Sequence, residues 1–199
     1  MALRQDTVVG TDGKSRCGWA SADPLYEKYH DQEWGRPLKD DRALFELLIL
    51  EGCQAGLSWI TVLRKREHYR KVYDGFDPAR IARYTPAKLA KLLADPGIIR
   101  HRGKIEASVT NAKAFLKLVE REGSFHRWLR QIVGTRSHPA PRTLKDVPAR
   151  TPESDVLAKA LVKEGFKFVG STICYAFMQA SGLVDDHVVG CHRRKELES

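Results

Sequence analysis

The sequence predicts an all-α fold. Apolar residues recur at helical spacing in several segments, Thr85-Pro86 and Thr151-Pro152 form typical helix starts, and no segment alternates polar and apolar residues with period two. The chain has 199 residues and a hydrophobic content of 42%, which is enough for a substantial core.

Each expected helix has a recognisable beginning or end. The expected helices are Asp40 or Asp41 to Leu50, a second beginning at Ser58, a third beginning at Thr85-Pro86 and ending before Asp95-Pro96-Gly97, a long amphipathic helix containing Ile105 to Val119, Phe125–Val133, Thr151-Pro152 to Gly165, and Ser171–Ser181. We expect short helical pieces and loops over residues 17–37 and a loop over 134–150. Residues 15–192 are expected to form one domain, with a flexible and irregular extension over 1–14 and a charged tail over 193–199.

The chain is strongly basic, with 34 Lys and Arg against 25 Asp and Glu and a formal charge of +9. This surplus favours a polyanionic partner, either nucleic acid or an anionic membrane surface, although a basic protein without such a partner carries the same charge. No segment is long and apolar enough to cross a bilayer, and residues 1–14 lack the apolar core of a signal peptide. We therefore expect a cytoplasmic monomer whose four cysteines are reduced thiols or metal ligands.

A carboxylate and an aromatic ring flank the junction between the first two expected helices. Glu51 ends the apolar run Ala43–Leu50, Gly52 and Gly56 bracket a short connection, and Trp59 opens the next apolar run. Such a pair could receive a flat molecule that donates hydrogen bonds or carries positive charge. A solvated glutamate at a helix end and a tryptophan in the core would explain the same residues.

The segment between the third and fourth expected helices resembles a helix–hairpin–helix element. Its candidate DNA-binding residues are Gly97, Ile98, Arg100, Arg102, Gly103 and Lys104. Glycine leaves backbone N–H groups exposed at a helix start, where these donors and the helix dipole can hold a phosphate without reading base sequence. The basic side chains add charge-assisted contacts. An ordinary helical corner with a charged tip is the alternative interpretation.

Four potential metal ligands lie in the two terminal segments: Cys17, His30, His187 and Cys191. His187 and Cys191 are four residues apart, so one helical turn would place them on one face. Two thiolates and two imidazoles would form a closed, structural zinc site that joins the two segments. Cys17 and His30 match no compact zinc-finger pattern, His192 is an alternative ligand, and buried thiols with surface histidines would need no metal.

The aromatic residues Trp19, Tyr26, Tyr29 and Trp59 provide more aromatic surface than one corner of a core needs. They could line a slot in which a planar base stacks. Packing in the core is the more common role for any one of them.

Seven segments together resemble the 3-methyladenine DNA glycosylase I family of bacterial repair enzymes. They are Arg16-Cys17-Gly18-Trp19, Asp23-Pro24-Leu25-Tyr26, Tyr29-His30-Asp31, Glu33-Trp34-Gly35, Glu51–Leu63, Gly97–Ile105 and Gly165–Cys191. The resemblance covers about residues 15–191, and motifs of this length and order are highly specific. It implies a helix–hairpin–helix glycosylase fold with a subdomain that zinc joins from the N- and C-terminal segments.

The resemblance also implies a role for each group of residues. Glu51 falls on the pocket carboxylate that hydrogen-bonds a flipped base, and Leu57 falls on the residue that is inserted into the DNA gap. The surrounding aromatic pocket corresponds to Trp19, Tyr26, Tyr29 and Trp59. The ligands of one structural Zn²⁺ correspond to Cys17, His30, His187 and Cys191. The segment before Arg16 and the tail after Cys191 depart from the family pattern.

The implied activity is hydrolysis of the N-glycosidic bond of N3-methyladenine in alkylated double-stranded DNA by base flipping. No clear lysine nucleophile is present in the hairpin, so we expect a monofunctional enzyme that does not cleave the strand. Two other classes stay open. A zinc-stapled DNA-binding module could sense damage without chemistry, and a helical protein of a membrane surface or a protein partner would explain only the charge.

Overall fold

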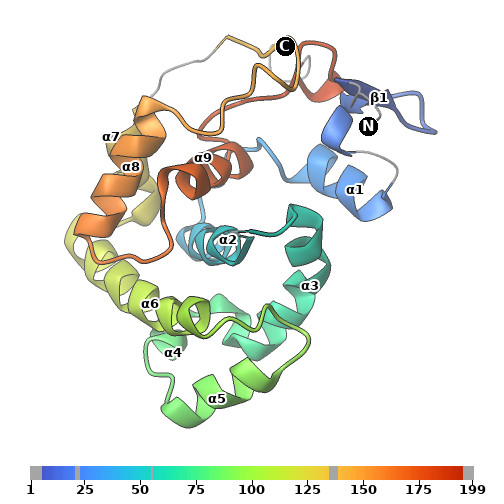
Figure 1. The fold of residues 1–199 in the computed structure, drawn as a ribbon. Coiled ribbons are helices and arrows are strands. Elements are labelled where there is room, and N and C mark those ends of the chain that lie inside the picture. Colours follow the sequence, from blue (N-terminus) through green and yellow to red (C-terminus); the bar gives the residue numbers. More distant parts are fainter. Residues whose placement is uncertain (1–5, 21–22, 55, 135–138, 195–199) are drawn as a thin grey trace. The chain divides into compact units, whose positions relative to one another are not determined.

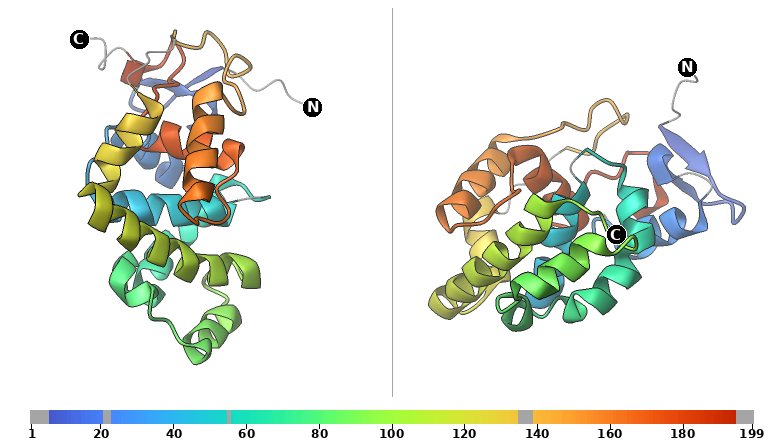
Figure 2. Two further views of the ribbon diagram at one scale, coloured as in Figure 1. Left: turned by 90° about the vertical axis from the view of Figure 1, so that its left-hand side faces the viewer. Right: turned by 60° about the horizontal axis from the view of Figure 1, so that its bottom comes forward.

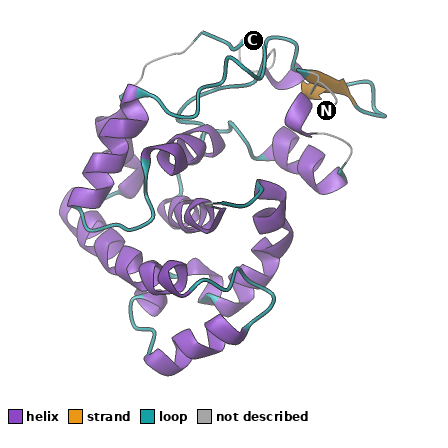
Figure 3. Cartoon of the chain, in the orientation of Figure 1, coloured by secondary structure: helices purple, strands orange, loops and turns teal. Residues whose placement is uncertain are grey.

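The computed structural model describes residues 6–20, 23–54, 56–134 and 139–194, which are mostly helical (Figure 1, Figure 3). Contacts between Cα atoms divide the chain into two compact units. Unit 1 comprises the described parts of Met1–Pro37, Thr135–Ala149 and Met178–Ser199, and unit 2 comprises those of Leu38–Gly134 and Arg150–Phe177. The prediction of a mainly helical fold is confirmed, whereas a single domain over residues 15–192 stays a prediction.

Unit 2 contains most of the helices. They are α2 Asp41–Gln54, α3 Trp59–Val72, the 3₁₀ turn η2 Asp74–Phe76, α4 Pro78–Ile81, α5 Pro86–Ala94, α6 Arg102–Glu122, α7 Phe125–Val133, α8 Pro152–Lys163 and α9 Ser171–Ala180, whose last turn belongs to unit 1. Helix α2 packs against α3 and α6 and stays beside both in the two views of Figure 2. None of the described helices combines the length and the hydropathy needed to span a bilayer.

The predicted helix starts are confirmed where a cap residue precedes proline. The Thr85 hydroxyl accepts a hydrogen bond from the Lys88 N–H of α5, and Thr151 forms a reciprocal capping box with Ser154 at the start of α8. A threonine or serine oxygen satisfies one of the N–H groups that the first helical turn leaves without a partner. Proline at the first helical position has no N–H to satisfy and already holds a helical φ.

Two adjacent aspartates cap the N-terminal ends of different helices. The Asp40 carboxylate caps α2 by accepting from the Ala43 N–H at 2.8 Å. The Asp41 carboxylate accepts from the Phe125 and His126 N–H groups of α7 at 2.9 and 2.8 Å, so α2 and α7 are joined at their N-terminal ends. A pair of residues that looked like alternative caps for one helix therefore positions two helices of the same core.

Aromatic rings pack against one another in the core of unit 2. Phe115 of α6 lies between Phe45 of α2 and Phe125 of α7, with ring centroids 4.9 and 5.1 Å apart. Tyr69 of α3 and Tyr73, directly after α3, are almost fully buried, with ring centroids 5.5 Å apart. Helix α2, which carries Glu51, packs against α3, α6 and α7.

The expectation that Glu51 ends its helix is wrong, because α2 continues to Gln54. Gly52 is helical, and a Cβ there would lie 3.5 Å from Phe168 of the α8–α9 connection, an ordinary van der Waals distance. The true end comes near Gly56, where φ is 81°. Glu51 therefore lies on the rigid part of α2 rather than on a loop.

Unit 1 departs from the all-α expectation. The extension over residues 1–14, which we expected to be irregular, contains the strand β1 Thr7–Val9, and this strand pairs antiparallel with β2 Ser15–Cys17, just after the extension (Figure 3). Gly13 adopts a φ of 75° in the connecting turn, and the Asp12 carboxylate accepts from the Lys14 N–H. An Asp-Gly turn between two short runs is a recognised hairpin signal, but runs of three residues are too short to show period two.

The rest of unit 1 comes from both ends of the chain. The 3₁₀ turn η1 Gly18–Ala20 and helix α1 Pro24–Gln32 follow β2, and the Gly35 N–H donates to the Gln179 carbonyl at 3.1 Å. Residues 184–188 have no helical structure, so the expected helical turn from His187 to Cys191 is wrong. A turn closed by the Cys191 N–H and the Val188 carbonyl places Cys191 instead.

Candidate functional site

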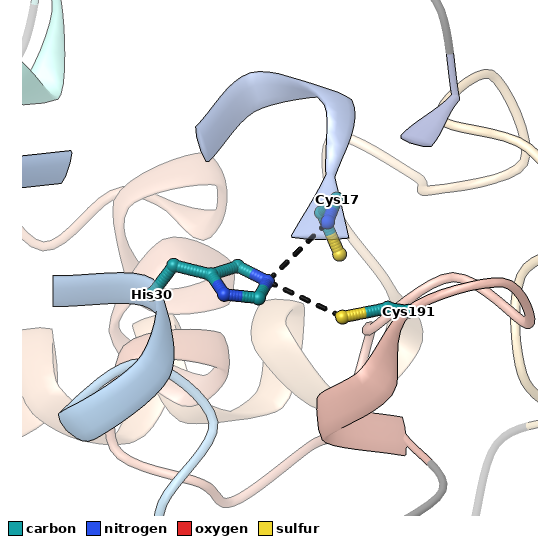
Figure 4. Close-up of side chains that lie close together, drawn as sticks. All are labelled: Cys17, His30 and Cys191. Atoms are coloured by element: carbon teal, nitrogen blue, oxygen red, sulfur yellow. Dashed lines mark hydrogen bonds between the residues drawn. The ribbon is translucent and has the colours of Figure 1, made fainter. Parts of the chain in front are cut away.

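Three of the four expected metal ligands meet in unit 1. The ligand atoms of Cys17, His30 and Cys191 all lie within 4.8 Å of one another, and the three residues are fully buried. Figure 4 shows them coming from β2, α1 and the C-terminal segment, with the His30 Nε2 atom 3.4 Å from the Cys191 Sγ atom. The group therefore links the N- and C-terminal segments and could hold a metal ion.

Hydrogen bonding makes the two thiols unequal. Hydrogen bonds from Cys17 and His30 lower the pKa of Cys191 to about 3, while the hydrogen bond to Cys191 and burial raise the pKa of Cys17. A metal ion binds thiolates, so both cysteines would bind it in the deprotonated form.

His187 lies beside this group but is not one of its three members. Its ring centroid is 5.1 Å from that of His30, and its Nδ1 atom is 2.6 Å from the Asp185 carboxylate. Its Nε2 atom is buried and has no hydrogen-bond partner among the described residues. A buried imidazole nitrogen without a partner is destabilising unless a ligand binds it.

His192 fits the ligand role less well than His187. Its Nδ1 atom is 3.0 Å from the Ser15 carbonyl, and its Nε2 atom is 3.7 Å from the Asp31 carboxylate. Both ring nitrogens therefore already face protein acceptors.

Carboxylates orient both of the other histidines. Asp31 contacts the His30 Nδ1 atom at 2.8 Å, as Asp185 contacts His187, which leaves each Nε2 atom for a metal. The buried Arg16 side chain donates to Asp31 and to Asp12. Although burial opposes it, the hydrogen bonds from Arg16 and His30 hold the pKa of Asp31 below its usual value. The sequence analysis assigned no role to Arg16, Asp31 or Asp185.

The expected base-stacking residues of unit 1 form one aromatic cluster. The Trp19 ring is 5.2 Å from that of Tyr26, 6.4 Å from that of Tyr29 and 4.9 Å from that of Trp34, which sequence reasoning did not single out. Tyr29 is buried, whereas Trp19 and Tyr26 are only half-buried. Part of this aromatic surface is therefore accessible.

Unit 2 carries the expected carboxylate. Glu51 is 2% exposed, and its Oε2 atom has no hydrogen-bond partner among the described residues. Burial raises its pKa to about 8. Trp59 begins α3 and is 8% exposed, whereas Leu57, in the connection between α2 and α3, is 42% exposed. Glu51 and Trp59 thus belong to one unit, and Trp19, Tyr26 and Tyr29 belong to the other.

The predicted hairpin joins α5 to α6 (Figure 1). The Asp95 carboxylate accepts from the Gly97 N–H at 2.7 Å and contacts the His68 Nε2 atom at 2.8 Å. A Cβ at residue 97 would collide with the His68 ring, so a larger residue would require this ring to move. Ile98 is buried beneath it, and the Ile99 N–H donates to the Tyr69 hydroxyl at 2.9 Å.

The basic residues of the hairpin divide into two kinds. Arg100 and Arg102 are exposed, and Arg102 forms a long contact of 3.4 Å with Glu106. Lys104 instead donates to the Cys53 carbonyl of α2 at 2.9 Å. The first turn of α6 begins at His101, whose Nδ1 atom accepts from the Lys104 N–H, while Gly103 lies close to the Phe168 ring.

Known proteins resemble this chain over most of its length. The sequence model of the methyladenine glycosylase family matches residues 19–194. The chain is 53% identical over 177 residues to DNA-3-methyladenine glycosylase 1 of Escherichia coli, covering 88% of this chain and 95% of the relative. A crystal structure of 3-methyladenine DNA glycosylase I is 54% identical, with a TM-score of 0.86 and coverage of 89% of this chain and 98% of the other. A Staphylococcus aureus enzyme, solved to explain 3-methyladenine recognition, is 37% identical, with a TM-score of 0.84 and coverage of 87% and 93%.

Proposed function

Because the chain belongs to the methyladenine glycosylase family, we propose that it removes 3-methyladenine from alkylated double-stranded DNA. The observation that carries the proposal is the buried Glu51 carboxyl with an unpartnered oxygen on a rigid helix. A buried carboxyl without a partner destabilises a protein, so its presence is best explained by a ligand that satisfies it.

Glu51 would recognise the base through hydrogen bonding and charge. Methylation at N3 makes the adenine of DNA cationic, and its N6 amine is a hydrogen-bond donor that guanine lacks at that position. A cation beside the Glu51 carboxyl would lower its pKa from about 8, so the base would bind to the charged carboxylate. A neutral base offers no such charge, which favours the alkylated one.

Aromatic side chains would hold the plane of the base. The half-buried rings of Trp19 and Tyr26, together with Tyr29 and Trp59, are the residues that we assign to stacking. A cation over an aromatic face is stabilised by about 0.5–2 kcal/mol, which again favours the methylated base over the neutral one.

DNA would be held at the hairpin and opened at Leu57. The exposed Arg100 and Arg102 side chains and the first N–H groups of α6 suit phosphate oxygens. The exposed Leu57 side chain would fill the gap left by the flipped nucleotide, which offsets part of the few kcal/mol that unpairing costs.

The reaction would be a hydrolysis without strand cleavage. The oxygen of water forms a bond to C1′ as the bond from C1′ to N9 breaks. The bonding electrons pass to the adenine ring and neutralise its charge, and one proton is released. The hairpin lysine Lys104 donates to the Cys53 carbonyl, which supports a monofunctional enzyme because a lysine nucleophile must be free to attack C1′.

A structural zinc ion would complete unit 1. Cys17, His30 and Cys191 supply three ligands, and the buried Nε2 atom of His187 is our assignment for the fourth. When bound, zinc would cross-link the terminal segments, and it takes no part in the hydrolysis.

Free-base release tests the proposed function. The protein is incubated with DNA that contains both N3-methyladenine and N7-methylguanine, and the liberated bases are identified. Release of 3-methyladenine alone supports the proposal, and Glu51→Ala should abolish it while the variant stays folded. DNA binding without base release would instead indicate a damage-binding module, and release by Glu51→Ala at the parental rate would refute the role of Glu51.

A further inference from the structure

An exposed phenylalanine lies between the helix that carries Glu51 and the hairpin. Phe168 belongs to the connection between α8 and α9, and its side chain is 41% exposed. Neither the base-binding residues nor the hairpin assigned above includes it.

The backbone of Phe168 is held in an unfavourable conformation. Its φ is 55°, a value that residues with a bulky side chain rarely adopt because it is sterically unfavourable. The buried side chain of Asn111 fixes the preceding residue, since it accepts from the Lys167 N–H at 2.7 Å and donates to the Lys167 carbonyl at 3.0 Å. The fold thus maintains a strained conformation that leaves the ring partly exposed.

The contacts of Phe168 define where its ring lies. Its Cβ and carbonyl oxygen lie 3.5 Å from the position that a Cβ of Gly52 would occupy, one residue after Glu51. Its Cζ atom lies 3.4 Å from the corresponding position at Gly103, and its ring is edge-on to His101 at 6.0 Å. The residue therefore reaches from α2, beside its Cβ atom, to the N-terminal turn of α6, beside its Cζ atom.

We propose that Phe168 binds DNA by packing its exposed ring against a deoxyribose of the strand held at the hairpin. The inference rests on the proposed function, in which a phosphate binds near Gly103 and the base binds at Glu51. A strand that joins these two positions must pass the ring, and a deoxyribose is its apolar part. The exposed cations Arg100 and Arg102 on the same hairpin favour DNA as the occupant of this surface.

Two substitutions separate the ring from the backbone strain. Phe168→Ala removes the ring and keeps a side chain at positive φ, whereas Phe168→Gly removes the ring and relieves the strain. Both variants should bind a duplex with a stable tetrahydrofuran abasic site about tenfold more weakly, within the range found when an aromatic residue that contacts nucleic acid is removed. Val162→Ala, at an apolar residue of α8 that is 61% exposed, is the matched control and should bind this duplex as the parent does.

A second measurement distinguishes DNA contact from a structural role. Binding of free 3-methyladenine reports the Glu51 pocket without DNA, and thermal unfolding reports the fold. Weaker duplex binding with unchanged binding of the free base would support the proposal. Duplex affinity within twofold of the parent in both variants, or parallel loss of duplex and free-base binding, would overturn it. A parent that neither binds nor releases 3-methyladenine would refute the proposed function instead.

Discussion

Replacing Glu51 with glutamine tests whether this carboxyl is destabilising in the folded protein. Gln keeps the size and one carbonyl oxygen of the side chain but cannot ionise. The folded-state pKa of about 8 lies above the ordinary value of 4.5, because burial disfavours the charged form. The parent therefore binds a proton more tightly when folded, and it loses stability relative to Glu51→Gln as the pH rises from about 4.5 through about 8.

The size of this effect follows from the two pKa values. Their difference of 8 minus 4.5, at about 1.4 kcal/mol for each pKa unit, gives roughly 5 kcal/mol once the pH is well above 8. Most of this difference develops between pH 5 and pH 8. For a chain of this size, 1 kcal/mol changes Tm by about 2–4 °C, so the Tm difference should grow by on the order of 10 °C.

Thermal unfolding of ligand-free parent and Glu51→Gln at pH 5 and pH 8 measures this quantity. The informative result is the change of the Tm difference with pH, since a buried amide has its own constant effect. Glu106→Gln, at an exposed residue of α6, is the control and should show no such change. A Tm difference between parent and Glu51→Gln that is the same at both pH values would refute a desolvated carboxyl at this position.

Two further predictions concern the metal group and the helix ends. His187→Ala should reduce the zinc content of the purified protein well below one ion per chain, whereas His192→Ala should retain about one ion. Metal analysis of the two purified variants measures this, and equal zinc in both would contradict the assignment of His187. Asp41→Ala should lower the unfolding free energy by about 1–2 kcal/mol, because the Phe125 and His126 N–H groups lose their acceptor, and an unchanged denaturant midpoint would show that water replaces the cap.

The sequence predicted what depends on local patterns. Thr85-Pro86 and Thr151-Pro152 marked helix starts correctly, because capping and proline geometry act within one turn. The strands β1 and β2 were missed because three residues are too few to show a period. The end of α2 was misplaced because Gly52, usually a helix breaker, lies inside a helix that packs against α3, α6 and α7, and these contacts are remote in sequence.

The candidate site was predictable only as far as residue types and family motifs reach. Cys17, His30 and Cys191 meet as the resemblance implied, yet their spacing in the sequence gave no reason to prefer them over unrelated thiols and imidazoles. Asp185 and Arg16 were missed because they act through hydrogen bonds to other side chains, and such roles depend on geometry.

Backbone strain alone does not mark a functional residue, and unit 2 contains the comparison that shows why. Phe76 and Phe168 both adopt positive φ values, 56° and 55°. Phe76 is fully buried, with its ring stacked 5.5 Å from that of Tyr73, so core packing accounts for the strain. Phe168 adopts the same conformation, yet its ring is 41% exposed. Packing within the described residues therefore accounts for less of the backbone strain at Phe168 than at Phe76. The same distinction applies to Glu51, whose buried oxygen has no partner among those residues. Where the fold maintains an unfavourable feature without an internal gain, the compensating contact is best sought in a ligand.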